Sequence, residues 1–141
     1  QNELGKIANL FNRDGGPTPP IGISVPQAMY DDFVEICKPV KNINPDFPFE
    51  VKVAKPRKRP TSTGGTDASV FAVEGVPTYG FTTDDIKGYN FSYGEIWHTE
   101  RDLYTKNIPE YQEHTAVVTA IVALGVANLD KQLSREGMYK E

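Results

Sequence analysis

The fold is decided by a stretch that begins Thr61-Ser62-Thr63-Gly64-Gly65-Thr66-Asp67, continues with Glu74-Gly75-Val76-Pro77 and ends Trp97-His98-Thr99-Glu100-Arg101-Asp102. Its two adjacent glycines let the backbone approach another group closely. Thr66 or Asp67 is suited to cap a short helix that follows them. The apolar side of that helix would consist of Val70, Phe71 and Val73.

The second half of this stretch predicts the end of the helix, a strand and a loop. Gly75 favours the left-handed conformation that ends a helix, and Pro77 cannot continue one. Residues 76–81 are predicted to form a short buried strand. A long polar and aromatic loop then leads to His98. A glycine-rich turn, a helix, a strand and a loop histidine in this order are typical of one wall of a site in an α/β enzyme.

The segments before this stretch predict three strands and a helix. Residues 6–12 are apolar enough for a buried strand, which would end beside Asp14 in a Gly-Gly-Pro turn. Residues 21–25 predict a second short strand, and residues 49–53 alternate as a half-buried edge strand does. Between them, a helix is expected to begin at Pro26 and to end at Pro39. Its apolar positions recur at helical spacing and are Met29, Phe33, Ile36, Cys37 and Val40.

The segments after the stretch predict one long helix and a tail. Residues 107–110 resemble a capping box. Residues 117–126 are apolar on almost every side, which predicts a helix buried against a sheet face. This helix is too short and too polar at its flanks to span a membrane. Residues 131–141 are expected to be a charged tail. The predicted fold class is therefore α/β, with a mixed sheet and helices on its faces.

Composition narrows the classes of partner. The chain has 141 residues and a net charge of −4, which fits one soluble globular domain and argues against a nucleic-acid partner. The basic residues 55–60 favour a solvated loop that prolines hold extended, because no aromatic residues alternate with the charges. Cys37 lies on an apolar helix face and predicts an inert buried thiol. Residues 1–4 have neither the basic start nor the apolar run of a signal peptide.

His98 is the sharpest candidate for chemistry. An imidazole is a common zinc ligand, and Asp102, Glu100 or a backbone carbonyl is available to orient its second nitrogen. A structural role for this single histidine remains the alternative, and His114 is expected to be structural or exposed. Asp14 by itself is typical of a turn. No HExxH pattern and no paired cysteines occur, so the residues alone predict only part of a metal site.

Taken together, these motifs resemble the carboxyl-terminal half of the di-zinc aminopeptidases. The resemblance covers about residues 6–133 and rests on the order and spacing of several short motifs, which are Asn12-Arg13-Asp14, Gly64-Gly65-Thr66-Asp67, Gly75-Val76-Pro77 and Trp97-His98-Thr99 followed by Asp102. That family includes secreted bacterial leucine aminopeptidases and, more distantly, glutamate carboxypeptidase II and the transferrin receptor. It implies a zinc-exopeptidase-like, phosphorylase/hydrolase-like fold, of which residues 1–141 would form the carboxyl-terminal part.

The resemblance also implies roles for individual residues. Asp14 would be a terminal ligand of one zinc ion and His98 a ligand of the other. Three residues would contact the peptide substrate, and three others would support the metal ligands and the histidine loop. The first three are Gly65, Thr66 and Trp97, and the others are Asp67, Thr99 and Asp102.

The activity implied is hydrolysis of an amino-terminal peptide bond by a water that two zinc ions activate. The general-base glutamate and the remaining ligands are expected upstream of this chain, so we expect the chain alone to be inactive and to hold zinc incompletely. The parent protein would be secreted or located in the cell envelope. Association of the chain with itself or with the missing half of the domain is expected, with no membrane or nucleic-acid partner.

Two departures from the family pattern bear on the site. Ala68 stands where many relatives have histidine, which would reshape the cleft. Trp97 stands where tyrosine is common, and an indole donates its hydrogen bond from a different position than a phenol does.

Two other functions on the same scaffold stay open, a non-catalytic receptor-like binding module and a single-zinc acyltransferase of glutaminyl-cyclase type.

Overall fold

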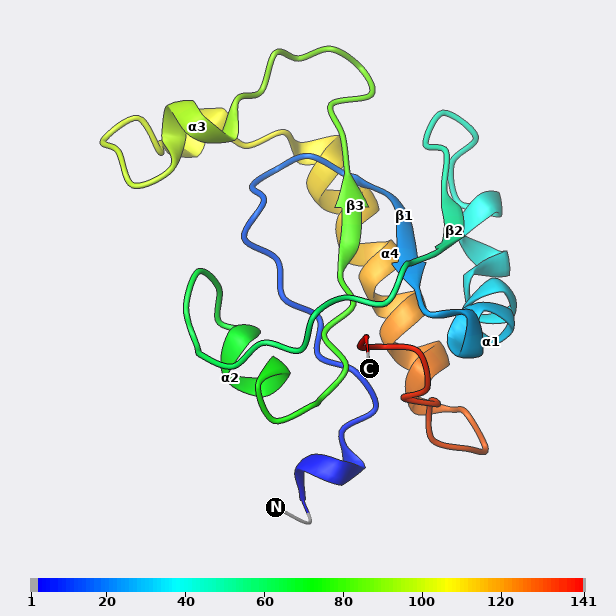
Figure 1. The fold of residues 1–141 in the computed structure, drawn as a ribbon. Helices are drawn as coiled ribbons and strands as arrows, with labels where there is room; N and C mark the ends of the chain where they lie inside the picture. The colour runs from blue at the N-terminus through cyan, green and yellow to red at the C-terminus, as the bar shows by residue number, and fades with distance from the viewer. Residues whose placement is uncertain (1–2, 141) are drawn as a thin grey trace.

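A three-stranded mixed sheet with the order β2-β1-β3 stands at the centre of the computed structural model, which describes residues 3–140 (Figure 1). The strands are β1 (Pro20–Val25), β2 (Glu50–Val53) and β3 (Phe81–Thr83). β1 runs parallel to β2, with Ile23 beside Val51, and antiparallel to β3, with Ile23 beside Phe81. The strands predicted over residues 21–25 and 49–53 are thus confirmed, whereas of the strand predicted over residues 76–81 only Phe81 belongs to β3.

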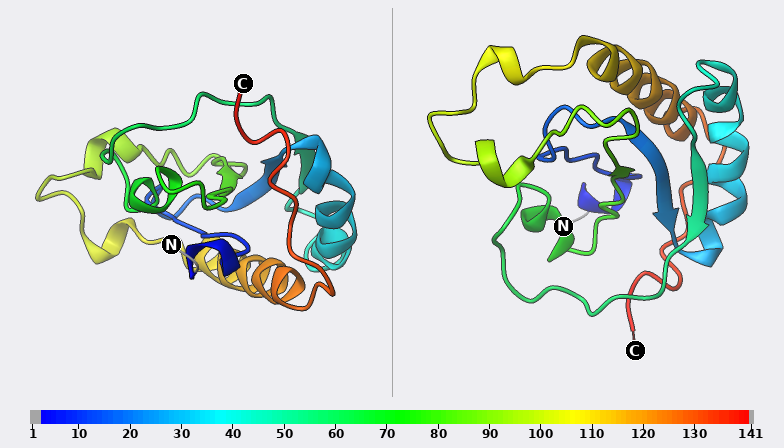
Figure 2. Two further views of the ribbon diagram at one scale, coloured as in Figure 1. Left: turned by 60° about the horizontal axis from the view of Figure 1, so that its bottom comes forward. Right: turned by 90° about the horizontal axis from the view of Figure 1, so that it is seen from above.

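Helices flank this sheet, so the domain is a small mixed α/β structure. α1 (Gln27–Cys37) follows Pro26 directly and ends before Pro39, as predicted, and the 3-10 turn η2 (Lys38–Asn42) continues it. α4 (Pro109–Ala127) is the long helix and packs on α1 and β1. Figure 2 shows α1 and α4 together on one side of the molecule, away from the short helices α2 (Ser69–Ala72) and α3 (Tyr93–Ile96).

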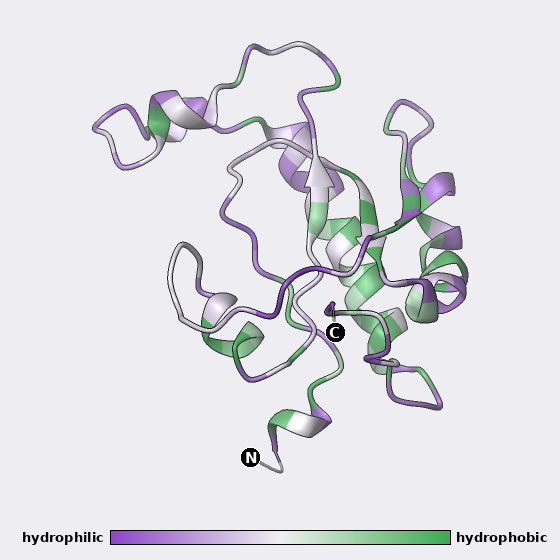
Figure 3. Ribbon diagram, in the orientation of Figure 1, coloured by the Kyte–Doolittle hydropathy of each residue, from purple (hydrophilic) through white to green (hydrophobic). Residues whose placement is uncertain are grey.

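The core lies between the sheet and these two long helices. Its centre is formed by fully buried side chains from β1, α1 and α4, which are Ile23, Val25, Met29, Phe33, Val118 and Val122. Figure 3 shows apolar residues concentrated along these elements. Gly125 permits the close packing of α4 on α1, because a Cβ atom there would lie 2.5 Å from a methyl group of Ile36.

Two expectations for α4 are wrong in part. The helix is capped by the backbone of Ile108 with no side-chain hydrogen bond, so residues 107–110 do not form a capping box. Only one face is buried, since Leu124 is 63% and Val117 38% exposed. Within residues 3–140, no helix has both the length and the apolar character needed to cross a membrane.

The amino-terminal strand predicted over residues 6–12 does not form. Leu4–Lys6 is a 3-10 turn, η1, and residues 7–14 have no regular pairing. Leu10 N donates to Pro77 O at 2.9 Å, and the Asn9 side chain exchanges two 2.9 Å hydrogen bonds with the backbone of Tyr79. The Asn9 side chain therefore takes the place of backbone hydrogen bonds between two strands. The segment that faces it, residues 77–80, becomes a regular strand only at Phe81, where β3 begins.

The carboxyl-terminal segment, predicted to be a charged tail, packs against the domain over residues 131–140. Residues 1–2 and 141 lie outside the described residues. Leu133 and Met138 are buried. Tyr139 forms a bridge with Arg57 and donates from its hydroxyl to Ala72 O at 3.1 Å. Arg57 and Arg59 both lie over the Tyr139 ring, so the basic segment packs against this ending instead of standing free.

His114 gives the fold a predicted dependence on pH. Its ring is 4% exposed and stacks on Phe47 at 4.2 Å, and neither ring nitrogen makes a hydrogen bond within residues 3–140. Burial lowers the pKa of His114 from its usual value, and the nearby carbonyl of Pro20 opposes this shift only in part. The unfolded chain titrates at about 6.5 and binds the extra proton below that pH.

We therefore expect the free energy of unfolding to be constant above about pH 6.5 and to fall as the pH drops from there toward the lower folded pKa. Urea unfolding at pH 7.5 and at pH 5.5 measures this fall. His114→Phe, which retains the stacking, should flatten it, whereas His98→Gln at the exposed second histidine should leave it intact. An equal fall in all three proteins would contradict the assignment.

Candidate functional site

Two adjoining hollows lie where the amino-terminal segment meets the glycine-rich and histidine loops. We call the first, of about 850 Å³, the Gly64 hollow, and the second, of about 650 Å³, the Lys106 hollow. Four residues line both, and these are Asp14, Tyr93, Trp97 and His98. Residues from three segments far apart in the sequence thus meet at one surface of the domain.

Asp14 is held by its neighbour Asn12. The Asn12 Nδ2 group donates to Asp14 Oδ2 and to Thr66 Oγ1, each at 2.7 Å. One amide group therefore ties the segment that carries the aspartate to the glycine-rich loop. It fixes the direction of the Asp14 carboxylate while that side chain stays exposed on the hollow.

The glycine-rich loop presents bare backbone to the Gly64 hollow. Gly64 and Gly65 have φ angles of 144° and 79°, which favour glycine, and a Cβ atom at either position would meet no atom within 4 Å. Gly64 N donates to Ser69 Oγ at 2.9 Å, which holds the loop on the first residue of α2. The two glycines therefore leave the loop backbone without side chains where it lines the Gly64 hollow.

The helix after this loop forms, with differences from prediction. It is capped by Ala68, and neither Thr66 nor Asp67 caps it with a side chain. Its buried side includes Ala72, whereas Val70 is 52% exposed and lines the Gly64 hollow. Gly75 has a φ of 79°, as its predicted position at the helix end requires.

The histidine loop is built by α3 and the turn after it. His98 has a φ of 56°, an unusual conformation for a residue other than glycine that is found often at functional sites. Its ring lies 4.5 Å from the Trp97 ring, which in turn stacks on Tyr93 at 6.2 Å. Thr99 Oγ1 donates to the carbonyls of α3 and accepts from Arg101 N at 3.2 Å, so this hydroxyl closes the turn.

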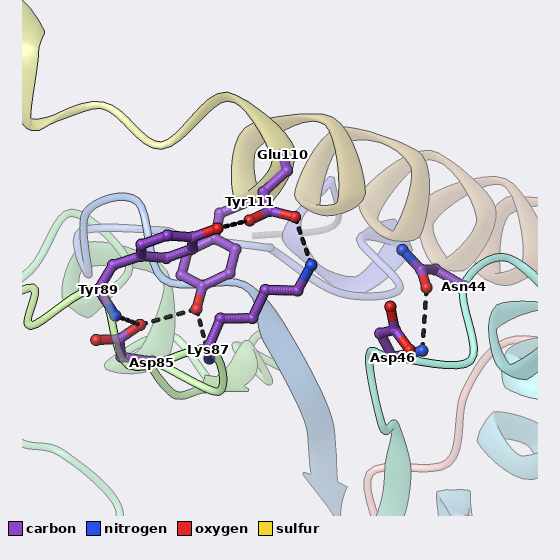
Figure 4. A network of polar contacts seen from close by, with 7 residues as sticks. All are labelled: Asn44, Asp46, Asp85, Lys87, Tyr89, Glu110 and Tyr111. Atoms are coloured by element: carbon purple, nitrogen blue, oxygen red, sulfur yellow. Dashed lines mark hydrogen bonds and ion pairs between the residues drawn. The ribbon is translucent and has the colours of Figure 1, made fainter.

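A polar network fixes the start of the segment that carries this loop to α4 (Figure 4). Tyr111, on α4, donates to Asp85 Oδ1 and accepts from Lys87 N, each at 2.8 Å. Glu110 accepts hydrogen bonds from Lys87 Nζ at 2.6 Å and from Tyr89 Oη. Residues 85–89 are thereby attached to the core, and the histidine loop extends from a fixed base.

The titration of this network agrees with its geometry. Burial raises the pKa of Tyr111 to about 12, so its hydroxyl stays protonated and donates. Burial also acts to raise the pKa of Asp85, but the hydrogen bonds from Tyr111 and the loop backbone outweigh it and lower that pKa. The Asp85 carboxylate is therefore charged at neutral pH and attracts the donors around it.

The structure gathers most of the predicted site residues at these hollows. Asp102 lines only the Lys106 hollow and reaches Thr99 through its backbone nitrogen, at 3.3 Å. Thr99 lines neither hollow and acts through the hydrogen bonds described above. The others line the Gly64 hollow, and they are Asp14, Gly65, Thr66, Asp67, Trp97 and His98.

The sequence analysis assigned no role to two residues of the site, Tyr93 and Asn12, although Asn12 belongs to the Asn12-Arg13-Asp14 motif. Asn12 orients Asp14, and its position two residues before an aspartate at a turn was the available signal. Tyr93 lines both hollows and stacks on Trp97 from the preceding helical turn, at a spacing of four residues that favours contact.

Metal ligation at the hollows is limited to what these side chains offer. Asp14 supplies one carboxylate and His98 one imidazole, both ligand types that zinc accepts. Among residues 3–140, no group of three or more His, Cys, Asp and Glu side chains is arranged to hold a metal ion.

Comparisons of the chain with protein-family models, with curated proteins and with solved structures find no match.

Proposed function

We propose that this chain is the carboxyl-terminal part of a zinc-dependent aminopeptidase with a zinc-exopeptidase-like fold. One observation supports the proposal above the others: Asp14 and His98, from opposite halves of the sequence, line the same two hollows. Gly65, Thr66 and Trp97 stand beside them at the Gly64 hollow. Two potential ligands and a bare glycine backbone on one open surface suit a peptidase that binds the end of an extended chain.

The residues present fit part of a two-zinc centre, one ligand for each ion. Asp14 and His98 would hold zinc, and bound zinc would supply Lewis-acid polarisation of a carbonyl and an acidified water. The other roles belong to this chain itself. Asn12 holds the carboxylate of Asp14 in one direction, and Thr99 holds the turn that presents His98.

The substrate would lie over the glycine-rich loop. Gly65 lines the hollow and a Cβ atom there would meet no atom within 4 Å, so its backbone N–H and C=O groups would hydrogen-bond the peptide backbone. The ring of Trp97 is 55% exposed and, with Tyr93 stacked on it, offers an apolar wall for a substrate side chain. The indole N–H is a donor only, so it would bind the substrate carbonyl from a different direction than a tyrosine hydroxyl.

The proposal includes a missing half that supplies the general base and the remaining ligands. Each zinc ion would otherwise have one protein ligand, and zinc sites use three or four. We therefore expect a longer protein containing this chain to hold two zinc ions per domain and to hydrolyse leucine p-nitroanilide. The 141-residue chain alone should show no zinc-dependent hydrolysis.

Zinc content by mass spectrometry and the rate of p-nitroaniline release test both parts. Robust hydrolysis by the 141-residue chain would refute the missing-half proposal. One zinc ion per domain, together with cyclisation of glutaminyl peptides, would favour the acyltransferase. Absence of both zinc and hydrolysis in the longer protein would favour the receptor-like module.

A further inference from the structure

β2 has one unused edge. Within residues 3–140 it pairs with β1 alone and forms one end of the sheet (Figure 1). Its four residues are mostly exposed, with Val51 half-buried and Val53 48% exposed. Unpaired N–H and C=O groups on such an edge are a template for another strand.

A groove accompanies this edge. It lies between α1 and β2 and has a volume of about 380 Å³. Tyr30, Val34 and Cys37 line it from α1, and Phe49 and Val51 from the strand side. A strand added to β2 would therefore meet an apolar wall as well as the backbone edge.

We propose that the occupant is a second copy of this chain, with the two β2 strands paired antiparallel and Val51 opposite Val51. This register places Glu50 of each copy opposite Lys52 of the other. It also places Phe49 opposite Val53. The same β2 surface serves both copies, as a two-fold interface requires.

The charges on β2 select this register. Glu50 and Lys52 point to the same face of the strand and form an exposed ion pair at 3.1 Å within one chain. Directly opposed unlike charges stabilise an antiparallel pair, and like charges destabilise it. With Val51 opposite its equivalent, every charge on the edge faces an opposite charge, and every apolar residue faces an apolar one. An unrelated strand would match this pattern only by coincidence.

This pairing does not depend on the proposed peptidase. Residues 7–12 run beside the segment leading into β3, at the end of the sheet opposite to β2. Further strands of a larger domain would join there and leave the β2 edge available. A four-residue strand makes a small interface, so the dimer should be weak and concentration-dependent.

Sedimentation equilibrium of the chain, from about 10 µM to about 1 mM, tests the proposal. We expect a reversible monomer–dimer equilibrium. The dimer contains two pairs of residues 50 and 52, and each single variant, Glu50→Lys or Lys52→Glu, makes both pairs like-charged. Each variant should raise the dimer dissociation constant at least about tenfold. A mixture of these two variants restores both unlike pairs and should dimerise as wild type does. The double variant Glu50→Lys/Lys52→Glu should also dimerise.

Glu113→Lys on α4 makes the same charge change away from β2 and serves as the control. It should leave the dissociation constant unchanged, and circular dichroism checks that every variant is folded. The proposal is overturned by a wild-type chain that stays monomeric up to about 1 mM. It is equally overturned by a dimer that both single variants leave intact, or by a mixture of the two that remains monomeric.

Discussion

Replacing His98 with alanine is expected to lower kcat/KM for leucine p-nitroanilide by at least about 1,000-fold in the longer peptidase that contains this chain. The proposed function assigns the imidazole to a zinc ion that polarises the scissile carbonyl. Such polarisation is worth about 4 kcal/mol, and each ~1.4 kcal/mol is a factor of ten in rate. Asp14→Ala should cost a similar factor, since the aspartate would hold the neighbouring ion.

The two changes should not be additive. If Asp14 and His98 serve one two-metal unit, removal of either disables it, and the double variant should lose about as much as each single variant. Independent structural roles would instead multiply the two factors. Each single variant should also retain less zinc than the wild type, by mass spectrometry after dialysis.

Glu100→Gln is the matched control for the histidine loop. Glu100 was one candidate to orient His98, but it is exposed, lines neither hollow and makes no hydrogen bond to His98 within residues 3–140. Its activity and zinc content should stay within about twofold of wild type. Wild-type activity in His98→Ala would sink the metal assignment, and a loss of activity with full zinc content would move His98 to a role in substrate binding.

Much of the fold was predictable because its patterns are local. The short apolar run of residues 21–25, the alternation of residues 49–53 and the helical spacing between Pro26 and Pro39 place β1, β2 and α1 correctly. The strand predicted over residues 6–12 was wrong, because an extended apolar pattern does not reveal how the backbone of that segment is paired. The Asn9 side chain takes the hydrogen bonds that a strand would have used, and it depends on Tyr79, far along the chain.

The site was predictable to the extent that short motifs mark it. The two glycines have the positive φ angles expected of a bare turn, and His98 lies on an exposed loop. The bond from Asn12 to Thr66 and the anchoring of Asp85 by Tyr111 were not predictable, because each joins residues from different elements. Periodicity describes single elements and carries no information about such pairs.

The stability of the whole domain should depend on Arg135, a residue in the segment that the sequence predicts to be a free tail. Its Nη1 group donates to Gly75 O at 3.1 Å, and its Nη2 group contacts the carbonyls of Leu4, Gly5 and Ile7 at 3.1–3.2 Å. The guanidinium thus joins the carboxyl-terminal segment, the amino-terminal turn and the end of the α2 region. A planar fork of fixed donors is suited to several carbonyls at once.

Arg135→Ala should lower the free energy of unfolding by about 3 kcal/mol, as measured by urea denaturation. A single hydrogen bond from a charged group contributes about 1.5–3 kcal/mol, and the sum is reduced here because water reaches the half-buried site. Arg135→Lys keeps the charge without the fork and should fall between alanine and wild type. Lys131→Ala removes the ion pair with Asp32 from the same segment and should cost at most about 1 kcal/mol. If Arg135→Ala costs no more than Lys131→Ala, the segment contributes through Leu133 and Met138 alone, and the two ends of the chain are not joined through this guanidinium.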